Sequence, residues 1–161
     1  MPSTPVTPLE SHRVINGREG KVFAENAVFI AWAESVEARM VIDRSDIIRA
    51  GTHVTGYKAM GASGSGTLNG FHVTSRYRRM IAEYMTTGIM PKPTTLVLEL
   101  SDPEAYAADG VPMVEIVTLR GVKFWETALG FDTGDVVRDD FPFTFEGLSF
   151  DETITPGAFL F

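Results

Sequence analysis

Apolar and polar residues alternate along much of this chain, which is the periodicity of β-strands. A first short strand is predicted at residues 21–24, before a turn at residues 25–26. The alternation continues through residues 28–41, with apolar side chains at Val36, Ala38 and Met40. A strand of that length would run about 46 Å at roughly 3.3 Å per residue, whereas a domain of this size is only about 40 Å across. We therefore expect this strand to reach the domain edge or to project beyond it.

The next segment, Ile42 to Gly66, is polar and rich in glycine, and it is predicted to be a long loop. Its glycines fit no nucleotide-binding motif, because Tyr57 stands where a phosphate-binding loop has lysine, and Asn69 stands where a dinucleotide fingerprint has its third glycine. Structureless loops of about 25 residues are uncommon in compact domains unless they are functional. The sequence therefore favours a structural, non-catalytic role for this loop.

One segment has the periodicity of a helix. After a strand at residues 67–73, Thr74 or Ser75 can cap a helix that Gly88 ends. Apolar side chains at spacings of three and four predict a single core-facing stripe, made of Tyr77, Met80, Ile81, Tyr84 and Met85. Such a stripe indicates packing rather than a cofactor site.

The remainder of the chain is predicted to be β-structure. Strands are expected at residues 95–101, 113–129 and 141–150. In the last two, the parity of the apolar positions changes at Gly121 and at Gly147, which is what a β-bulge produces. Pro142 places the final strand at an edge or a bulge. Repeated bulges indicate a strongly curved sheet, as in a barrel or a tight sandwich.

Composition adds a single soluble domain to this picture. The chain has 161 residues, of which 44% are hydrophobic, and it has no cysteine, so disulfides and thiolate metal sites are excluded. Residues 1–14 are rich in Pro, Ser and Thr and are predicted to form a flexible arm. No secretory signal or membrane-spanning run is visible, which favours folding in the cytoplasm.

The charge is unevenly distributed. Residues 1–90 carry ten Lys/Arg and eight Asp/Glu (+2), and residues 91–161 carry four and thirteen (−9), which together give the net −7. A chain this acidic is unsuited to wrapping nucleic acid, although it suits a surface that nucleic acid slides past. The asymmetry could also guide head-to-tail self-association, or simply reflect a solvated acidic face.

No constellation of residues predicts catalysis, a metal or a cofactor. The three histidines, His12, His53 and His72, lack metal-ligand spacing. The acidic segment 132–140 brackets a turn but lacks the ligand order of an EF-hand, and solvated turn carboxylates are the favoured interpretation. A glycosidase pair could be drawn from Glu99, Glu115 and Glu126, but nothing shows that any two converge.

The order of several strings resembles a known family. These are Ile-Asn-Gly-Arg-Glu-Gly-Lys-Val-Phe (15–23), Thr-Gly-Tyr-Lys-Ala-Met-Gly-Ala-Ser-Gly-Ser-Gly-Thr (55–67), Val-Thr-Ser-Arg-Tyr (73–77) and Phe-Pro-Phe-Thr-Phe-Glu-Gly (141–147). With them, residues 15–150 resemble the tail tube protein family of contractile-tailed phages and PBSX-type phage-like elements. The resemblance covers 136 of the 161 residues, and it divides the chain into an arm (1–14), a tail tube β domain (15–152) and a C-terminal tail (153–161).

The resemblance implies a mainly β fold with one α-helix, an antiparallel β-sandwich or barrel with a protruding hairpin and a long loop. It further implies a structural protein of the virion tail, assembled in the host cytoplasm, whose hexameric rings stack into a tube. DNA would pass through the lumen without specific binding. The partners would be other copies of the chain, the tail sheath protein, the baseplate and the tail terminator. No enzymatic activity, cofactor or membrane anchor is implied.

Two sets of residues acquire roles under this resemblance. The glycine-rich loop would bridge neighbouring subunits through Gly51, Gly56, Tyr57, Lys58, Gly61, Gly64 and Gly66. A negatively charged lumen would repel DNA phosphates, and its candidate carboxylates are Asp132, Asp135, Asp139 and Asp140.

Two other functions stay open from the sequence. One is the tube of a bacteriocin or secretion-like contractile apparatus without DNA cargo. The other is a β-sandwich module of a baseplate, or one that binds carbohydrate.

Overall fold

The computed structural model of the chain describes residues 11, 15–106, 110 and 112–154. The predicted arm at residues 1–14 lies outside the described residues except for Ser11. The predicted tail at residues 153–161 lies outside them beyond Ile154.

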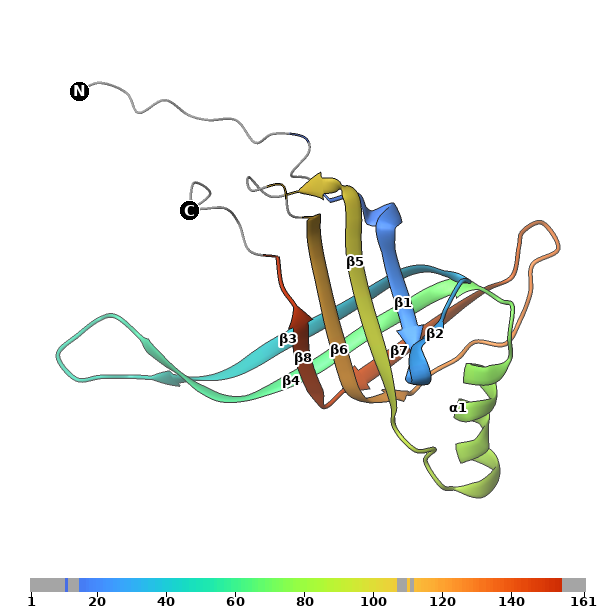
Figure 1. Ribbon diagram of the computed structural model, residues 1–161. Coiled ribbons are helices and arrows are strands. Elements are labelled where there is room, and N and C mark those ends of the chain that lie inside the picture. Colours follow the sequence, from blue (N-terminus) through green and yellow to red (C-terminus); the bar gives the residue numbers. More distant parts are fainter. Residues whose placement is uncertain (1–10, 12–14, 107–109, 111, 155–161) are drawn as a thin grey trace.

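The described chain forms eight strands and one α-helix (Figure 1). The N-terminal half contains a 3-10 turn η2 (Gly17–Glu19), β1 (Gly20–Ala24), a second 3-10 turn η3 (Glu25–Ala27), β2 (Val28–Phe29), β3 (Ala33–Ile47) and β4 (Gly56–Phe71). The helix α1 (Arg76–Thr87) follows, and then β5 (Thr94–Tyr106), β6 (Pro112–Phe124), β7 (Arg138–Phe145) and β8 (Gly147–Glu152).

The strands form one antiparallel, strongly bent sheet with α1 beside it. The strand order is β2-β1-β5-β6-β7-β4-β3, and β8 pairs with β6 off this path. The prediction of a mainly β, antiparallel fold with one helix is confirmed. Because the order begins at β2 and ends at β3, the sheet is open rather than closed into a barrel.

The sheet bends at the two glycines where parity changes in the sequence. Between the register pairs Leu96↔Leu119 and Thr94↔Val122, two residues of β6 (Arg120 and Gly121) lie opposite the single residue Thr95 of β5, which confirms the bulge predicted at Gly121. Gly121 has φ +66°, which favours glycine. At Gly147 the prediction of a bulge within one strand is wrong. The strand breaks at Glu146, where pairing with β4 has ended, while pairing with β6 continues in the same register from β7 into β8.

Pro142 lies in an interior strand, because β7 pairs with β4 on one side and with β6 on the other. However, Phe143 and Thr144 are the two residues of β7 that pair with β6. The Pro142 carbonyl oxygen accepts a hydrogen bond from the Trp125 N–H at 3.2 Å, just beyond the end of β6. Because N and C=O of one strand residue face the same side, the missing N–H falls where the neighbouring strand has ended. The edge position predicted from Pro142 is therefore confined to the part of β7 that lies beyond the end of β6.

The core is an aromatic cluster between the sheet and the helix. The ring of Tyr77 lies 4.8 Å from that of Phe124 and 5.6 Å from that of Phe141, centroid to centroid. Tyr77 is buried, and Met80 and Ile81 pack against the core as predicted. Tyr84 and Met85, predicted on the same stripe, are 53% and 89% exposed. Only the N-terminal half of α1 therefore packs on the core, and its last turn extends beyond it.

The largest difference from the sequence-based expectation concerns residues 42–66, which are not a loop. β3 continues to Ile47 and β4 begins at Gly56, so the segment is a β-hairpin with a turn at residues 48–55. The two strands are paired along their length, from Ser35↔Asn69 to Ile47↔Gly56. The predicted long strand that passes the domain edge is confirmed, and the hairpin projects from the sheet (Figure 1).

Candidate assembly surfaces

The projecting part of the β3–β4 hairpin, residues 41–63, is called the arm from here on. It is a different segment from the predicted N-terminal arm, residues 1–14. β4 pairs with β7 only from Gly64 onward, so each strand of the arm has no partner but the other. The register shifts at Asp43 and Arg44, where the extra residue Met60 forms a bulge. A two-stranded ribbon without a covering layer is marginally stable in water. The arm is therefore a segment that further contacts would stabilise.

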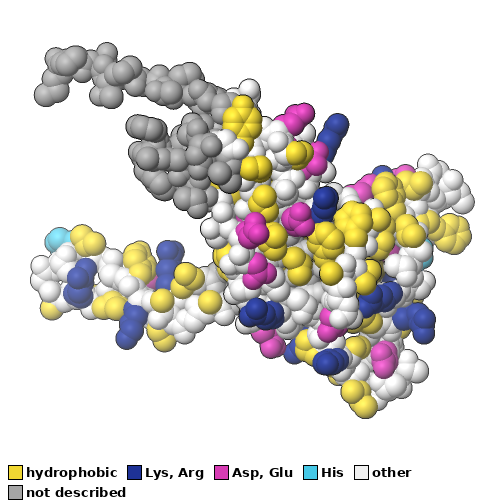
Figure 2. Space-filling view, viewed as in Figure 1, with side chains coloured by type: hydrophobic (Ala, Val, Ile, Leu, Met, Phe, Trp, Pro, Cys, Tyr) yellow, Lys and Arg dark blue, Asp and Glu magenta, His cyan; other side chains and the backbone are white. Residues whose placement is uncertain are grey.

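One face of the arm continues the face that packs on the core. Within the domain this face carries Val36 and Leu68, which are paired across β3 and β4. Since side chains alternate along a strand, Met40 and Ile42 lie on the same face further out, and they are 55% and 69% exposed. Tyr57 lies beyond the bulge, is 60% exposed, and carries the Arg44 guanidinium 4.8 Å above its ring. Figure 2 shows hydrophobic and basic side chains along the projecting hairpin.

The predicted inter-subunit residues divide between the arm and its base. Gly51, in the turn with φ +80°, and Gly56, Tyr57, Lys58 and Gly61 belong to the arm. Gly64 and Gly66 instead lie inside the sheet, opposite Phe145 and Phe143 of β7. The two aromatic rings occupy the space in which a Cβ would stand at these glycines. Gly64 and Gly66 therefore serve close packing, and not the flexibility that a loop would need.

The opposite face of the same sheet is exposed and carries short polar side chains. Directly paired residues share a face, and the Asn69 amide donates to the Ser35 hydroxyl at 3.3 Å across the strands. Three rows run across β3, β4 and β7: Ser35–Asn69–Asp140, Glu37–Thr67–Pro142 and Arg39–Ser65–Thr144. Arg39 and Glu37 form an exposed ion pair at 3.0 Å. This surface is called the polar face.

The four candidate lumen carboxylates fall in three environments. Asp140 lies on the polar face. Asp132 and Asp135 lie in the turn between β6 and β7, where Asp132 accepts from the Gly134 N–H at 3.0 Å and Asp135 pairs with Arg138 at 3.4 Å. Asp139 points the other way, and its side chain is only 2% exposed. A buried carboxylate cannot face a channel, so Asp139 is withdrawn from the set.

Asp139 joins β7 to the start of the helix. One oxygen lies 2.7 Å from His72 Nδ1, and the other accepts from Arg78 Nε at 2.8 Å and from a terminal nitrogen of the same guanidinium. The side chains of His72 and Arg78 are themselves only 26% and 15% exposed. A buried carboxylate needs such charged and hydrogen-bonded partners. This cluster therefore fixes α1 against the sheet and is structural.

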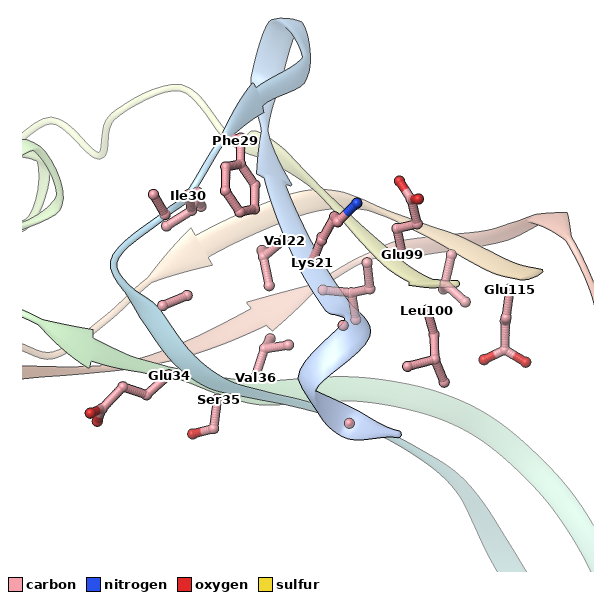
Figure 3. Close-up of a pocket in the computed structure, with 16 residues that line it drawn as sticks. Lys21, Val22, Phe29, Ile30, Glu34, Ser35, Val36, Glu99, Leu100 and Glu115 are labelled. Carbon is pink, nitrogen blue, oxygen red and sulfur yellow. The ribbon is translucent and has the colours of Figure 1, made fainter. Parts of the chain in front are cut away.

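A cleft of about 440 Å³ opens where the bent sheet fails to close, between β1 and the first residues of β3 (Figure 3). Val22 and Val36 point toward one another across it (Figure 3). Its floor is apolar and includes Leu98, Leu100 and Val117, and Glu115 lies on the same face because it pairs with Leu100. Lys21 lies at the rim, and its side chain points to the opposite face, like that of its register partner Glu99. Neither Lys21 nor Glu115 makes an ion pair with another described residue.

The described residues show no arrangement for chemistry. No group of three or more His, Asp or Glu side chains among them could hold a metal ion. Glu99 pairs with Ile116 and Glu115 with Leu100, so the two carboxylates lie on opposite faces of the sheet. Glu126 lies in the exposed loop after β6. In the described part of the chain, no helix is long and apolar enough to cross a membrane.

Sequence reasoning predicted a protruding hairpin but placed a loop where the arm has strands, and it missed the cleft. A signal for the arm was present, because the alternation at Val36, Ala38 and Met40 continues through Ile42. No local pattern could reveal the cleft, because its walls come from strands far apart in the sequence. Exposed apolar side chains in the loop after β6, among them Leu129 (76%) and Phe131 (82%), were also not singled out.

Comparison with known proteins places these surfaces in context. A family model described as "Phage tail tube protein" matches residues 7–152. The chain is 30% identical over 148 residues to the uncharacterized protein YqbM of Bacillus subtilis (strain 168), covering 91% of this chain and 96% of YqbM. It is 29% identical over 150 residues to the phage-like element PBSX protein XkdM of the same strain, covering 91% and 97%.

The fold also matches a solved structure. A chain of the sheath–tube complex of the PVC extracellular contractile injection system, in its extended state, superimposes with a TM-score of 0.63 at 10% identity. The match covers 89% of this chain and 95% of the other. At this identity, the likeness establishes the fold.

Proposed function

This chain belongs to the phage tail tube protein family, and on that premise we propose that six copies close into a ring and that rings stack into a hollow inner tube. The chain is a structural protein of the virion tail. The described residues offer no site for catalysis, and we propose that it needs no cofactor. Because the family match covers residues 7–152, a carbohydrate-binding module is no longer a candidate function.

The observation that supports self-assembly is the uncovered arm. Its core-side face exposes Ile42 and Tyr57, and Met40 is exposed next to its base, although the same face is packed within the domain. Burying apolar surface yields roughly 25 cal/mol per Å², so contact with another copy would stabilise the arm. We propose that the arm, including Gly51, Gly56, Tyr57, Lys58 and Gly61, bridges neighbouring subunits, and that Gly64 and Gly66 support its base.

The polar face is the surface that we propose lines the lumen. Short hydroxyl and amide side chains leave a channel wide. The cations of this face, Arg39, Lys123 and Arg138, are each paired with a carboxylate, whereas Asp140 has no ion-pair partner among the described residues. Such a wall offers DNA phosphates few cations to bind, so the DNA would pass without being held. Asp132 and Asp135 are exposed carboxylates of the adjoining turn and stay candidates for the rim of this channel.

We also propose that a contractile sheath surrounds this tube and that a baseplate and a terminator bound its two ends. The sheath–tube complex from which the structural neighbour comes supports the first of these contacts. Because that neighbour belongs to an injection system, a tube of an injection apparatus without DNA cargo is the second candidate function.

Negative-stain electron microscopy of the purified protein tests the assembly directly. Rings and hollow tubes at high concentration are expected, together with a sedimentation profile that shifts with concentration. Uniform particles of monomer size across a wide concentration range would contradict self-assembly. A tube purified from particles that contain no nucleic acid would select the second candidate.

A further inference from the structure

The cleft lies between two open edges of the sheet. β3 ends the strand order, so the outer edge of its first residues has no partner strand among the described residues. On the other side, β2 pairs only with Phe23 and Ala24 of β1, so Gly20 has no partner strand on its outer side among the described residues, although its N–H donates to the Gly17 carbonyl. Unpaired strand edges are places where another chain is readily added. The cleft thus combines an apolar floor with an available edge on β3.

We propose that this cleft receives the tip of the arm, residues 48–55, from a second copy of the chain. The inference rests on the proposed assembly and adds to it the surface that accepts the arm. It assigns a binding role to Val22, Val36, Leu100 and Glu115, which the sequence did not indicate.

The arm cannot reach the cleft of its own subunit. Val36 lines the cleft, and Ile47 ends the same continuous strand eleven residues later. At roughly 3.3 Å per residue, the two lie about 36 Å apart along β3. The tip projects away from the body of the domain (Figure 1). Only the cleft of another subunit is therefore accessible to it.

The tip matches the cleft in chemistry. Ile48 is 91% exposed and Val54 is 68% exposed, so the tip presents two apolar side chains to its surroundings. Between them lies Arg49, and residues 48–55 contain no Asp or Glu. The cleft offers an apolar floor and the carboxylate of Glu115, which has no cationic partner among the described residues. Its volume of about 440 Å³ is in the range that holds a few side chains of a ligand.

The contact is head-to-tail, because the arm tip and the cleft are different surfaces. Heterologous contacts of this kind either close into rings or continue as open helical stacks. An arm that passes from each subunit into the cleft of the next therefore produces the kind of assembly that a tube requires.

Cysteine crosslinking tests the contact, since the natural chain contains no cysteine. Lys21→Cys at the rim of the cleft and Ala50→Cys at the tip change two exposed residues. Assembled protein carrying both should give a ladder of covalent oligomers with a short bismaleimide, and mass spectrometry should identify peptides that join position 21 of one chain to position 50 of another. The matched control combines Lys21→Cys with Met85→Cys, a position that is 89% exposed on α1, and it should give no ladder.

A charge reversal provides a second readout. Arg49→Glu and Glu115→Arg should each cause loss of tubes, and the double variant should recover them. Tubes from either single variant at the wild-type yield, or no recovery in the double variant, overturn the pairing of tip and cleft. So do equal ladders from the Met85 control, or a crosslink from Lys21→Cys to a second cysteine that is introduced, in place of Ala50→Cys, within residues 1–14 or 155–161. Wild-type protein that forms no rings or tubes contradicts the proposed function itself.

Discussion

The ring of Phe143 lies directly over Gly66, its register partner across β7 and β4. A Cβ at Gly66 would stand 2.5 Å from the Phe143 ring carbon Cζ and would also collide with the backbone oxygen of Glu37. Phe145 covers Gly64 in the same way. The aromatic side chains of β7 therefore fill the places of missing side chains on β4, at the base of the arm.

Gly66→Ala should accordingly destabilise the subunit by about 1–3 kcal/mol, as overpacking of a filled site does. Gly61→Ala is the matched control on the same strand, because a Cβ there has nothing within 4 Å. Gly61→Ala should be neutral or stabilise by up to about 1 kcal/mol through the unfolded state. Urea unfolding measures both, and equal free energies of unfolding for the two variants would refute the packing role of Gly66.

These glycines show why the sequence predicted a loop where the structure has a hairpin. Glycine is common both in flexible loops and where two chain segments approach closely, and its neighbours in sequence do not distinguish the two. The distinction depends on Phe143 and Phe145, about 77–81 residues later in the chain. By contrast, the fold class, the bulge at Gly121 and the overlong strand could be predicted, because each depends on local periodicity.

The alternation of side chains along β7 separates Asp139 from Asp140, the two candidate lumen carboxylates on this strand, without a structure. Phe141, Phe143 and Phe145 occupy odd positions and were predicted to face one way, and Asp139 shares that parity while Asp140 does not. The structure buries Asp139 and exposes Asp140 accordingly. What the sequence could not supply was the partner set, because His72 and Arg78 come from a different part of the chain.

Asp139→Ala should cost about 3–5 kcal/mol of stability, since it leaves the largely buried Arg78 without its counter-charge. The neighbouring Asp140→Ala removes an exposed carboxylate and should change stability by no more than about 0.5 kcal/mol. Chemical denaturation of the two variants under the same conditions checks the difference. A cost for Asp140→Ala as large as that for Asp139→Ala would contradict the structural role of the cluster.

Burial raises the pKa of Tyr77 above its ordinary value of 10.0, and the nearby Arg76 guanidinium offsets part of that increase. Below pH 10 the phenol is protonated in both the folded and unfolded states, so its contribution to stability is fully present. As the pH rises above about 10, the unfolded chain releases this proton first, and the free energy of unfolding falls.

The Tyr77→Phe variant should therefore lose less stability than the wild type between about pH 9 and 11. Urea unfolding at several pH values measures the slope. Tyr57→Phe, at a side chain that is 60% exposed on the arm, is the control and should keep the wild-type slope. An unchanged slope in Tyr77→Phe would show that other groups account for the alkaline loss.

Shortening the arm should separate folding from assembly. Residues 44–60 can be replaced by Asn-Gly, which joins the register partners Asp43 and Gly61 through a two-residue hairpin turn. The deletion touches no residue of the core, so the subunit should keep its circular dichroism spectrum and its cooperative unfolding. Tubes should be lost in electron micrographs, and normal tubes from the shortened chain would exclude the arm as a bridge.

The two faces of the arm should differ in the same assay. Ile42→Ser changes the face that continues the core, where Ile42 is 69% exposed, and it should reduce tube yield. Val41→Ser changes the opposite face, where Val41 is 45% exposed, and it should leave tube yield unchanged. Equal yields from these variants would show that the core-side face is not the one that another copy covers.

The polar face makes the last prediction, which concerns DNA passage. Asp140→Lys adds one cation per subunit to a face with few, and six subunits would place a ring of them around the lumen. Tubes should form as before, because Asp140 is exposed. DNA ejection should slow at low salt and recover as salt rises, since phosphate contacts weaken steeply with ionic strength.

The double variant Asp132→Lys/Asp135→Lys tests the adjoining turn in the same way. Normal ejection at low salt from both variants would refute the proposed lumen, and a tube map with all three carboxylates on the outer surface would refute their assignment.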